Sequence, residues 1–163
     1  MTMTHSLQRG YIMFEVLISV LVISVGFIGL AGMQVGGLAA ANDSLFRSKA
    51  VYLSYQMADR VRANMPGAVA GNYDYLTGPG SNPGCVTTGC TSAQMAANDF
   101  FEWAAEVAAL LPAGVGVICR DSSPDGGSST SDDCNAAPGA PLAVKVWWTE
   151  NGIEHGFQTA FQP

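Results

Sequence analysis

Residues 11–30 read YIMFEVLISVLVISVGFIGL, and Glu15 carries the only charge among them. A helix of about twenty residues is roughly 30 Å long at about 1.5 Å per residue, which is the thickness of the hydrocarbon core of a bilayer. After Glu15, the next charged residue along the chain is Asp43. We therefore predict that residues 11–41 form a helix that can span a membrane.

Two common kinds of apolar N-terminal segment explain this stretch incompletely. A secretory signal peptide has a shorter apolar run, although Ala39-Ala40-Ala41 would offer a cleavage site of small residues. A plain signal anchor fits the length, but it gives no reason for a carboxylate so early in the apolar block. A third interpretation starts from the polar leader MTMTHSLQRG, residues 1–10, which ends in Gly10 directly before Tyr11.

The stretch GYIMFE, residues 10–15, resembles the processing site of the precursors of type IV pilins. In that family, a prepilin peptidase of the inner membrane cuts after the glycine and methylates the new amino terminus. The resemblance implies cleavage between Gly10 and Tyr11 and N-methylation of Tyr11. Tyrosine stands here in place of the more usual phenylalanine.

The carboxylate of Glu15 requires a partner, because a charge within the apolar core of a bilayer costs at least a few kcal/mol. After cleavage, the amine of Tyr11 would lie one helical turn away on the same face. Two opposite charges about 4 Å apart attract by roughly 4 kcal/mol at an effective dielectric constant of 20. The family resemblance implies that Glu15 pairs with the amino terminus of a neighbouring subunit during assembly. The alternative is that its carboxylate extends to the lipid headgroups.

Two further segments resemble the PilV group of minor pilins: GFIGLAGMQ, residues 26–34, and QMADRVRAN, residues 56–64. With the processing site and the Val-Trp-Trp run at 146–148, the likeness touches about half of the chain. It implies a minor pilin that primes type IV pilus assembly and supports twitching motility and adhesion. The implied partners are other minor pilins, the major pilin, the prepilin peptidase, a tip adhesin and the inner membrane, and the implied final location is the pilus at the cell surface.

Two other functions stay open on the sequence alone. The same fold would suit a minor pseudopilin of a type II secretion system, whose loss would abolish exoprotein secretion. An uncleaved, membrane-anchored periplasmic binding module would carry the same apolar helix with its leader intact.

The cysteines and the basic residues give opposite indications of orientation. Arg9 precedes the apolar helix, whereas Arg47 and Lys49 follow it, contrary to the positive-inside rule. All four cysteines lie after the helix, and an even number of cysteines is typical of disulfide-bonded proteins in an oxidising compartment. We give the cysteines more weight and predict that the C-terminal part is periplasmic.

Two disulfide bonds are predicted from the four cysteines. Cys85 and Cys90 are expected to close a small loop, because their spacing and the lack of nearby histidines argue against a metal site. A bond between Cys119 and Cys134 would tie a long Ser/Asp/Gly/Pro-rich loop to the neighbouring strand.

Beyond the apolar run, the helical pattern continues and becomes amphipathic. One face carries apolar residues at helical spacing: Phe46, Ala50, Leu53, Met57 and Val61. Asn64-Met65-Pro66-Gly67 is predicted to end this helix. The predicted organisation is a leader at 1–10, a transmembrane and assembly helix at 11–41, an amphipathic helix at 42–66 and a periplasmic, disulfide-stabilised head at 67–163.

The head is predicted to combine a helix with an antiparallel sheet. Thr91 and Gln94 have capping-box spacing at the start of the helix, and its acidic residues Asp99, Glu102 and Glu106 share one side that we expect to be solvated. Alternating residues predict strands at 115–119, 142–149 and 153–161, the last two joined by a tight turn. The predicted fold class is α+β, a type IV pilin-like arrangement of a long N-terminal helix packed on a small antiparallel sheet with a second helix.

Composition and motifs argue against several other functions. The net charge of −6 and the lack of a basic stripe make a nucleic-acid partner improbable. The sequence has no nucleophile elbow, phosphate-binding loop or zinc-protease motif, and His155 is the only histidine left after processing. We expect no catalytic residue and no cofactor.

One loop partly matches a calcium-binding template. Its positions 1, 3, 5, 6 and 12 are occupied by Asp121, Ser123, Asp125, Gly126 and Asp132. Aspartate replaces the glutamate expected at the last position, and no helices are predicted on either side. We therefore expect a solvated, serine-rich loop without a metal ion.

Overall fold

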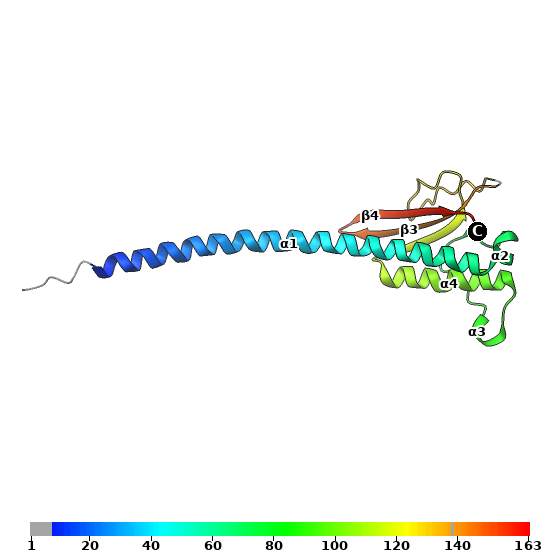
Figure 1. Cartoon of the computed structure of the whole chain (residues 1–163), viewed down its shortest axis with the longest axis horizontal. Coiled ribbons are helices and arrows are strands. Elements are labelled where there is room, and N and C mark those ends of the chain that lie inside the picture. Colours follow the sequence, from blue (N-terminus) through cyan, green and yellow to red (C-terminus); the bar gives the residue numbers. More distant parts are fainter. Residues whose placement is uncertain (1–7, 138) are drawn as a thin grey trace, which may run out of the picture. The chain divides into compact units, whose positions relative to one another are not determined.

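The computed structural model describes residues 8–137 and 139–163, and for residues 8–10 and 88 it describes the backbone alone. The first seven residues of the predicted leader lie outside the described residues. The chain divides into two compact units, one that ends at Asp43 and one that comprises Ser44–Pro163. Helix α1 (Gln8–Ala63) is continuous and contributes to both (Figure 1).

The first unit contains the N-terminal part of α1. All residues from 11 to 43 are exposed. The most apolar window of the helix has a mean hydropathy of 2.5, and none of that window is buried. By length and composition, α1 could therefore cross a membrane, and the helix predicted over residues 11–41 lies within it.

The second unit is the head. After the C-terminal part of α1, it comprises α2 (Met65–Val69), β1 (Tyr75–Leu76), α3 (Cys85–Thr88), α4 (Ser92–Leu110), β2 (Val115–Arg120), β3 (Leu142–Glu150) and β4 (Ile153–Phe161). Its sheet is antiparallel with the strand order β1-β2-β3-β4. Asn151 and Gly152 join β3 to β4 with φ angles of 51° and 78°, the left-handed values that a tight two-residue hairpin turn uses.

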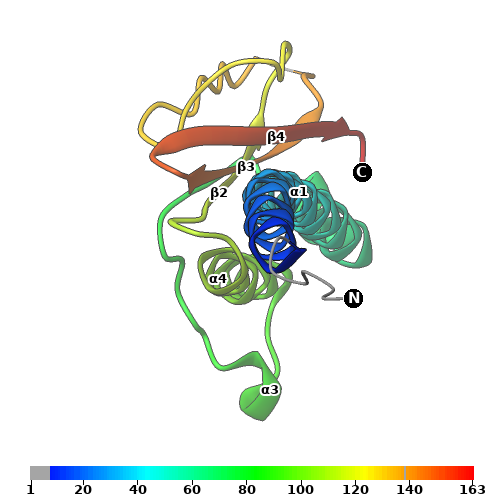
Figure 2. The same ribbon diagram turned by 90° about the vertical axis from the view of Figure 1, so that its left-hand side faces the viewer.

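The main core lies between the helices and one face of the sheet (Figure 2). Leu53 and Met57 from α1 and Val144 from β3 are completely buried there. Trp103 of α4 is also completely buried, and its indole Nε1 donates a hydrogen bond to the Leu53 carbonyl oxygen at 2.8 Å. The ring of Trp103 lies so close to β2 that Gly116 has no room for a Cβ. The α+β class with a long helix on an antiparallel sheet is confirmed.

The sheet is covered on its second face as well, which the alternation in the sequence did not indicate. The loop between β2 and β3 lies on this face, opposite the helices (Figure 2). Val117, Cys119 and Trp147 form a second buried cluster beneath it. Seven consecutive residues of β3 are therefore buried, although alternate ones point away from the helices.

The prediction of a solvated acidic face on α4 holds for Glu102, which is exposed, but is wrong for Asp99. Asp99 is buried, and its carboxylate accepts a hydrogen bond from the Tyr73 hydroxyl at 2.5 Å. Glu102 accepts one from Arg60 of α1 at 2.8 Å, and Glu106 accepts one from the Gln56 side chain at 2.9 Å. The acidic side of α4 faces polar groups of α1, and this pairing depends on contacts between segments distant in sequence.

Candidate membrane and assembly surfaces

The first candidate surface is the bare apolar helix of the first unit. Tyr11 is 76% exposed, Phe27 66% and Met33 78%. A single helix with large apolar side chains on all sides is stable only when lipid or other helices cover it. This surface therefore requires an apolar environment.

Glu15 places a carboxylate in this surface. A shallow hollow of about 280 Å³ on the helix is lined by Tyr11, Phe14, Glu15, Ile18 and Ser19. The Ser19 hydroxyl donates to the backbone carbonyl of Glu15 at 2.8 Å, so it does not neutralise the carboxylate. Among the side chains that the structure describes, none binds the Glu15 carboxylate. A cation from outside this chain could therefore reach it.

The residues of the predicted processing site lie at the start of the same helix. Gly10 is in the helical backbone of α1, and Tyr11 follows it with its side chain exposed. Tyr11 and Glu15 are four residues apart within one continuous helix, which places them on the same face. Cleavage after Gly10 and methylation of Tyr11 stay predictions.

The second candidate surface is the solvent-facing side of α1 in the head. We name it the tyrosine stripe, and its exposed residues recur at helical spacing: Leu45, Ser48, Tyr52, Tyr55, Asp59 and Arg62. Tyr52 and Tyr55 are 60% and 55% exposed. Sequence reasoning missed these two tyrosines, because it followed the charged residues of this face. The signal in the sequence was the position of two large aromatic residues outside the apolar stripe of an amphipathic helix.

A buried polar network holds the C-terminal end of α1 against α4. Asn64 donates from Nδ2 to the Tyr73 hydroxyl at 3.0 Å and to the Ser92 carbonyl at 2.8 Å. The Tyr73 hydroxyl in turn donates to Asp99, and the Arg60 guanidinium lies 3.7 Å from the same carboxylate. The network fixes the end of the helix that carries the tyrosine stripe.

Burial changes the ionisation of this network. It raises the pKa of the Tyr73 hydroxyl well above its usual range, and the hydrogen bond to Asp99 raises that pKa further. Burial also raises the pKa of the Asp99 carboxyl, although the Tyr73 hydrogen bond and the charge of Arg60 act in the opposite direction. The hydrogen bond from Arg60 instead lowers the pKa of Glu102, with a smaller contribution from Asn98.

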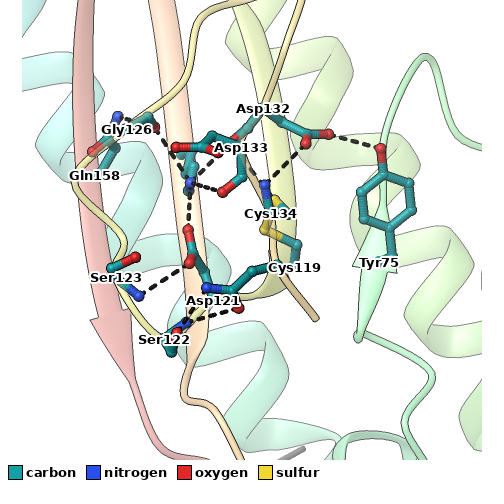
Figure 3. The surroundings of a disulfide bond; sticks show 12 residues. Tyr75, Cys119, Asp121, Ser122, Ser123, Gly126, Asp132, Asp133, Cys134 and Gln158 are labelled. Atoms are coloured by element: carbon teal, nitrogen blue, oxygen red, sulfur yellow. Dashed lines mark hydrogen bonds and ion pairs between the residues drawn. A yellow bond between two sulfur atoms is a disulfide. The ribbon is translucent and has the colours of Figure 1, made fainter. Parts of the chain in front are cut away.

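The head contains two disulfide bonds, Cys85–Cys90 and Cys119–Cys134. These are the two pairs that the sequence suggested. The first closes a loop of α3 beside the start of α4. The second joins β2 to the long loop that covers the outer face of the sheet (Figure 3).

The loop of the second disulfide does not have the geometry expected from the calcium template. The side chain of Asp121 is completely buried and forms an ion pair with Lys145 of β3, at 2.5 Å between Oδ2 and Nζ. Asp132 instead accepts hydrogen bonds from the Tyr75 hydroxyl at 2.7 Å and from the Cys134 amide at 3.2 Å. The expectation of a merely solvated loop is therefore wrong for Asp121, and sequence reasoning gave Lys145 no role.

One comparison with known proteins bears on these surfaces. Residues 32–101 match the family model described as type IV pilin Tt1218. The match supports the assignment of this chain as a type IV pilin. It covers less than half of the 163 residues, from the middle of α1 to the first half of α4. No curated protein and no solved structure matches the chain.

The pilin match does not include the predicted processing site. The matched range begins at residue 32, well after Gly10, Tyr11 and Glu15. It includes the tyrosine stripe and most of the polar network at the end of α1. The match thus lies outside the stretch that resembles a processing site, and a match to a type IV pilin implies association with other pilins in a pilus.

Proposed function

We propose that this chain is a minor pilin of the type IV pilus, of the PilV group, which primes pilus assembly within a complex of minor pilins. The observation that carries the proposal is an exposed apolar helix with Glu15 near its start, in a chain whose residues 32–101 match a type IV pilin. The choice of a minor pilin of the PilV group rests on the resemblance of residues 26–34 and 56–64. In this role the subunit supports twitching motility and adhesion.

The proposed mechanism begins with processing. The prepilin peptidase cuts after Gly10 and methylates the amine of Tyr11. The mature helix stays in the inner membrane until the subunit joins a neighbour, and lipid is then replaced by the apolar helices of other pilins. Glu15 pairs with the amino terminus of that neighbour, which fixes the axial position of one subunit against the next.

The head faces the periplasm in this proposal. The two disulfide bonds support that orientation, because such bonds form and persist in an oxidising compartment. The tyrosine stripe is an exposed surface of α1 within the head, and we assign it to contact with neighbouring pilins. The partners are the other minor pilins, the major pilin and a tip adhesin, and the subunit has no reaction of its own.

The experiment that tests this mechanism is the substitution Glu15→Ala in the full chain. We expect normal cleavage after Gly10, because the carboxylate is not at the scissile bond, but at least a tenfold loss of the subunit from complexes co-purified with other minor pilins. Ser19→Ala is the matched control, since it removes a polar group one turn further along the same helix and leaves the carboxylate intact. Equal incorporation of Glu15→Ala and wild type would contradict the proposed mechanism.

Two observations would favour the other functions. A deletion strain that keeps intact pili but no longer secretes exoproteins would favour the pseudopilin. An intact leader in cells with a working prepilin peptidase would favour the membrane-anchored binding module.

A further inference from the structure

The disulfide-closed loop between β2 and β3 contains a buried positive charge that holds three of its segments together. Lys145 lies on β3, beneath the loop, and its side chain is completely buried together with that of Asp121. Besides the ion pair, its ammonium donates to the carbonyl oxygens of Gly126 at 3.3 Å, Asp132 at 2.8 Å and Asp133 at 3.3 Å. Figure 3 shows these loop residues converging on one point.

This geometry is that of a small cation site in which the bound cation, the Lys145 ammonium, belongs to the same chain. One carboxylate oxygen and three carbonyl oxygens point inward from the two ends and the middle of the loop. An ammonium offers three N–H donors, which suits oxygen acceptors gathered in this way. Of the carboxylates in the calcium template, Asp121 reaches the centre, whereas Asp132 is bound by Tyr75 and the Cys134 amide.

We propose that the Lys145 ammonium is the structural cation of this loop, so that the loop folds without a metal ion. When the lysine side chain is shortened, the same oxygens bind a small primary ammonium ion from solution. The proposal concerns the head alone and is independent of the pilin assignment.

The loop requires this ammonium because buried oxygen atoms without a cation or a hydrogen-bond donor are energetically costly. Without the ammonium, the buried Asp121 carboxylate has lost its counter-ion and the carbonyl groups of Asp132 and Asp133 have lost a donor. The Gly126 carbonyl keeps the hydrogen bond that it accepts from the Gln158 side chain at 2.9 Å. Removing one partner of a buried ion pair is strongly destabilising, because it leaves an uncompensated buried charge. The Cys119–Cys134 bond still joins the two ends of this loop, so the main loss of protection falls on residues 121–133 between them.

The test compares hydrogen exchange of the loop in three variants of the full chain in detergent micelles. In Lys145→Ala, and in Lys145→Met, which keeps most of the volume but not the charge, we expect amide protection of residues 121–133 to fall about a hundredfold or more. Lys49→Ala is the control, because that lysine is partly exposed and makes a single 3.3 Å hydrogen bond to the Leu110 carbonyl. We expect it to leave loop protection unchanged.

The decisive probe is n-propylammonium, which reproduces the lysine side chain from Cγ to Nζ. We expect it to restore loop protection in Lys145→Ala by about tenfold at concentrations near ten times its dissociation constant, and to do nothing in Lys145→Met, whose side chain fills the space. Sodium chloride at the same ionic strength should have no effect. If Lys145→Ala unfolds the whole head, the same compound should restore protection in α4 as well.

Three results would overturn the proposal. Unchanged loop protection in Lys145→Met would mean that the positive charge is not needed. No effect of n-propylammonium on Lys145→Ala would mean that the oxygens do not form a cation site. Calcium chloride that raises loop protection in the wild type, beyond the effect of ionic strength, would mean that the loop is a metal site after all.

Discussion

Phe27 and Phe100 both lie on helices of this chain, yet Phe27 is 66% exposed and Phe100 only 1%. Phe27 belongs to the first unit, where a single helix presents apolar side chains on all sides. Phe100 belongs to the head, where helices and a sheet bury their apolar faces against each other. The first unit thus relies on lipid or other subunits for its stability, whereas the head contains its own core.

Because of this difference, shortening an apolar side chain should affect a different property in each unit. Replacing a large apolar side chain with alanine in the head should lower the folding stability of the head. The same change in the first unit should affect membrane insertion or assembly and leave the head folded. The following predictions test that contrast.

The largest effect is expected for Trp103→Ala. The substitution removes a completely buried ring and its hydrogen bond to Leu53, so the free energy of unfolding of the head should fall by about 3–5 kcal/mol. Phe27→Ala should leave that free energy unchanged, because an exposed ring has no buried contacts to lose. Denaturant unfolding of both variants in micelles, followed by near-ultraviolet circular dichroism, checks the pair. Equal losses would contradict the contrast between the units.

The two disulfide bonds should differ in their contributions to the head. Replacing Cys119 and Cys134 with serine opens a loop of 15 residues and should cost about 3 kcal/mol on the chain-entropy model. The same change at Cys85 and Cys90, whose separation is 5, should cost about 2 kcal/mol. Thermal unfolding of both double variants measures the order, and a larger loss at Cys85–Cys90 would contradict it.

The pairing of α4 with α1 should appear as a pH dependence. Because the pKa of Glu102 is lowered in the folded state, its stabilising effect is complete above its unfolded pKa near 4.5 and is lost as the pH falls through the folded value. The contribution of Asp99 to stability changes with pH in the opposite direction. Its raised pKa favours the folded state at low pH, and this effect is lost as the pH rises through the pKa of the folded state.

Glu102→Gln isolates the first of these two effects. It should lower stability at pH 7 by less than about 1 kcal/mol, because the glutamate side chain is 44% exposed, and the difference from wild type should shrink below pH 4. Chemical unfolding across pH 3–7 measures this, with the exposed Asp59→Asn as control. A difference that grows toward low pH would have the wrong sign.

The smallest effect on stability is expected in the tyrosine stripe. Tyr52→Ala should change the free energy of unfolding by less than about 0.5 kcal/mol, whereas Leu53→Ala, at the next position, should cost about 2–5 kcal/mol, because Leu53 is completely buried. If the stripe contacts neighbouring pilins, Tyr52→Ala should still lower co-purification with them. A large loss of stability in Tyr52→Ala would show that the stripe is part of the core.

The features that could be predicted depend on residues close together in sequence. The apolar stripe of α1, the capping box of Thr91 and Gln94 and the hairpin turn at Asn151-Gly152 are all local patterns, and the structure contains each of them. The Thr91 side chain accepts a hydrogen bond from the Gln94 amide at 3.3 Å, as the spacing suggested.

The features that could not be predicted depend on long-range contacts. Lys145 is buried because it meets Asp121, which lies on the preceding loop, and nothing in an alternating strand sequence indicates such a partner. Asp99 is buried because Tyr73 and Arg60 reach it from other segments. The two-residue strand β1 is too short for a period and is defined by its pairing with β2.

The central claim is that the chain is processed at Gly10 and enters a pilus, and peptide mass spectrometry of sheared pili tests it most directly. Trypsin cuts after Arg9 and Arg47, so the unprocessed chain gives a peptide that begins at Gly10 and the processed chain gives one that begins at Tyr11. We predict an N-methylated peptide beginning at Tyr11 in the sheared fraction. Detection of the Gly10 peptide alone, confined to membranes of cells with a working prepilin peptidase, would contradict the claim.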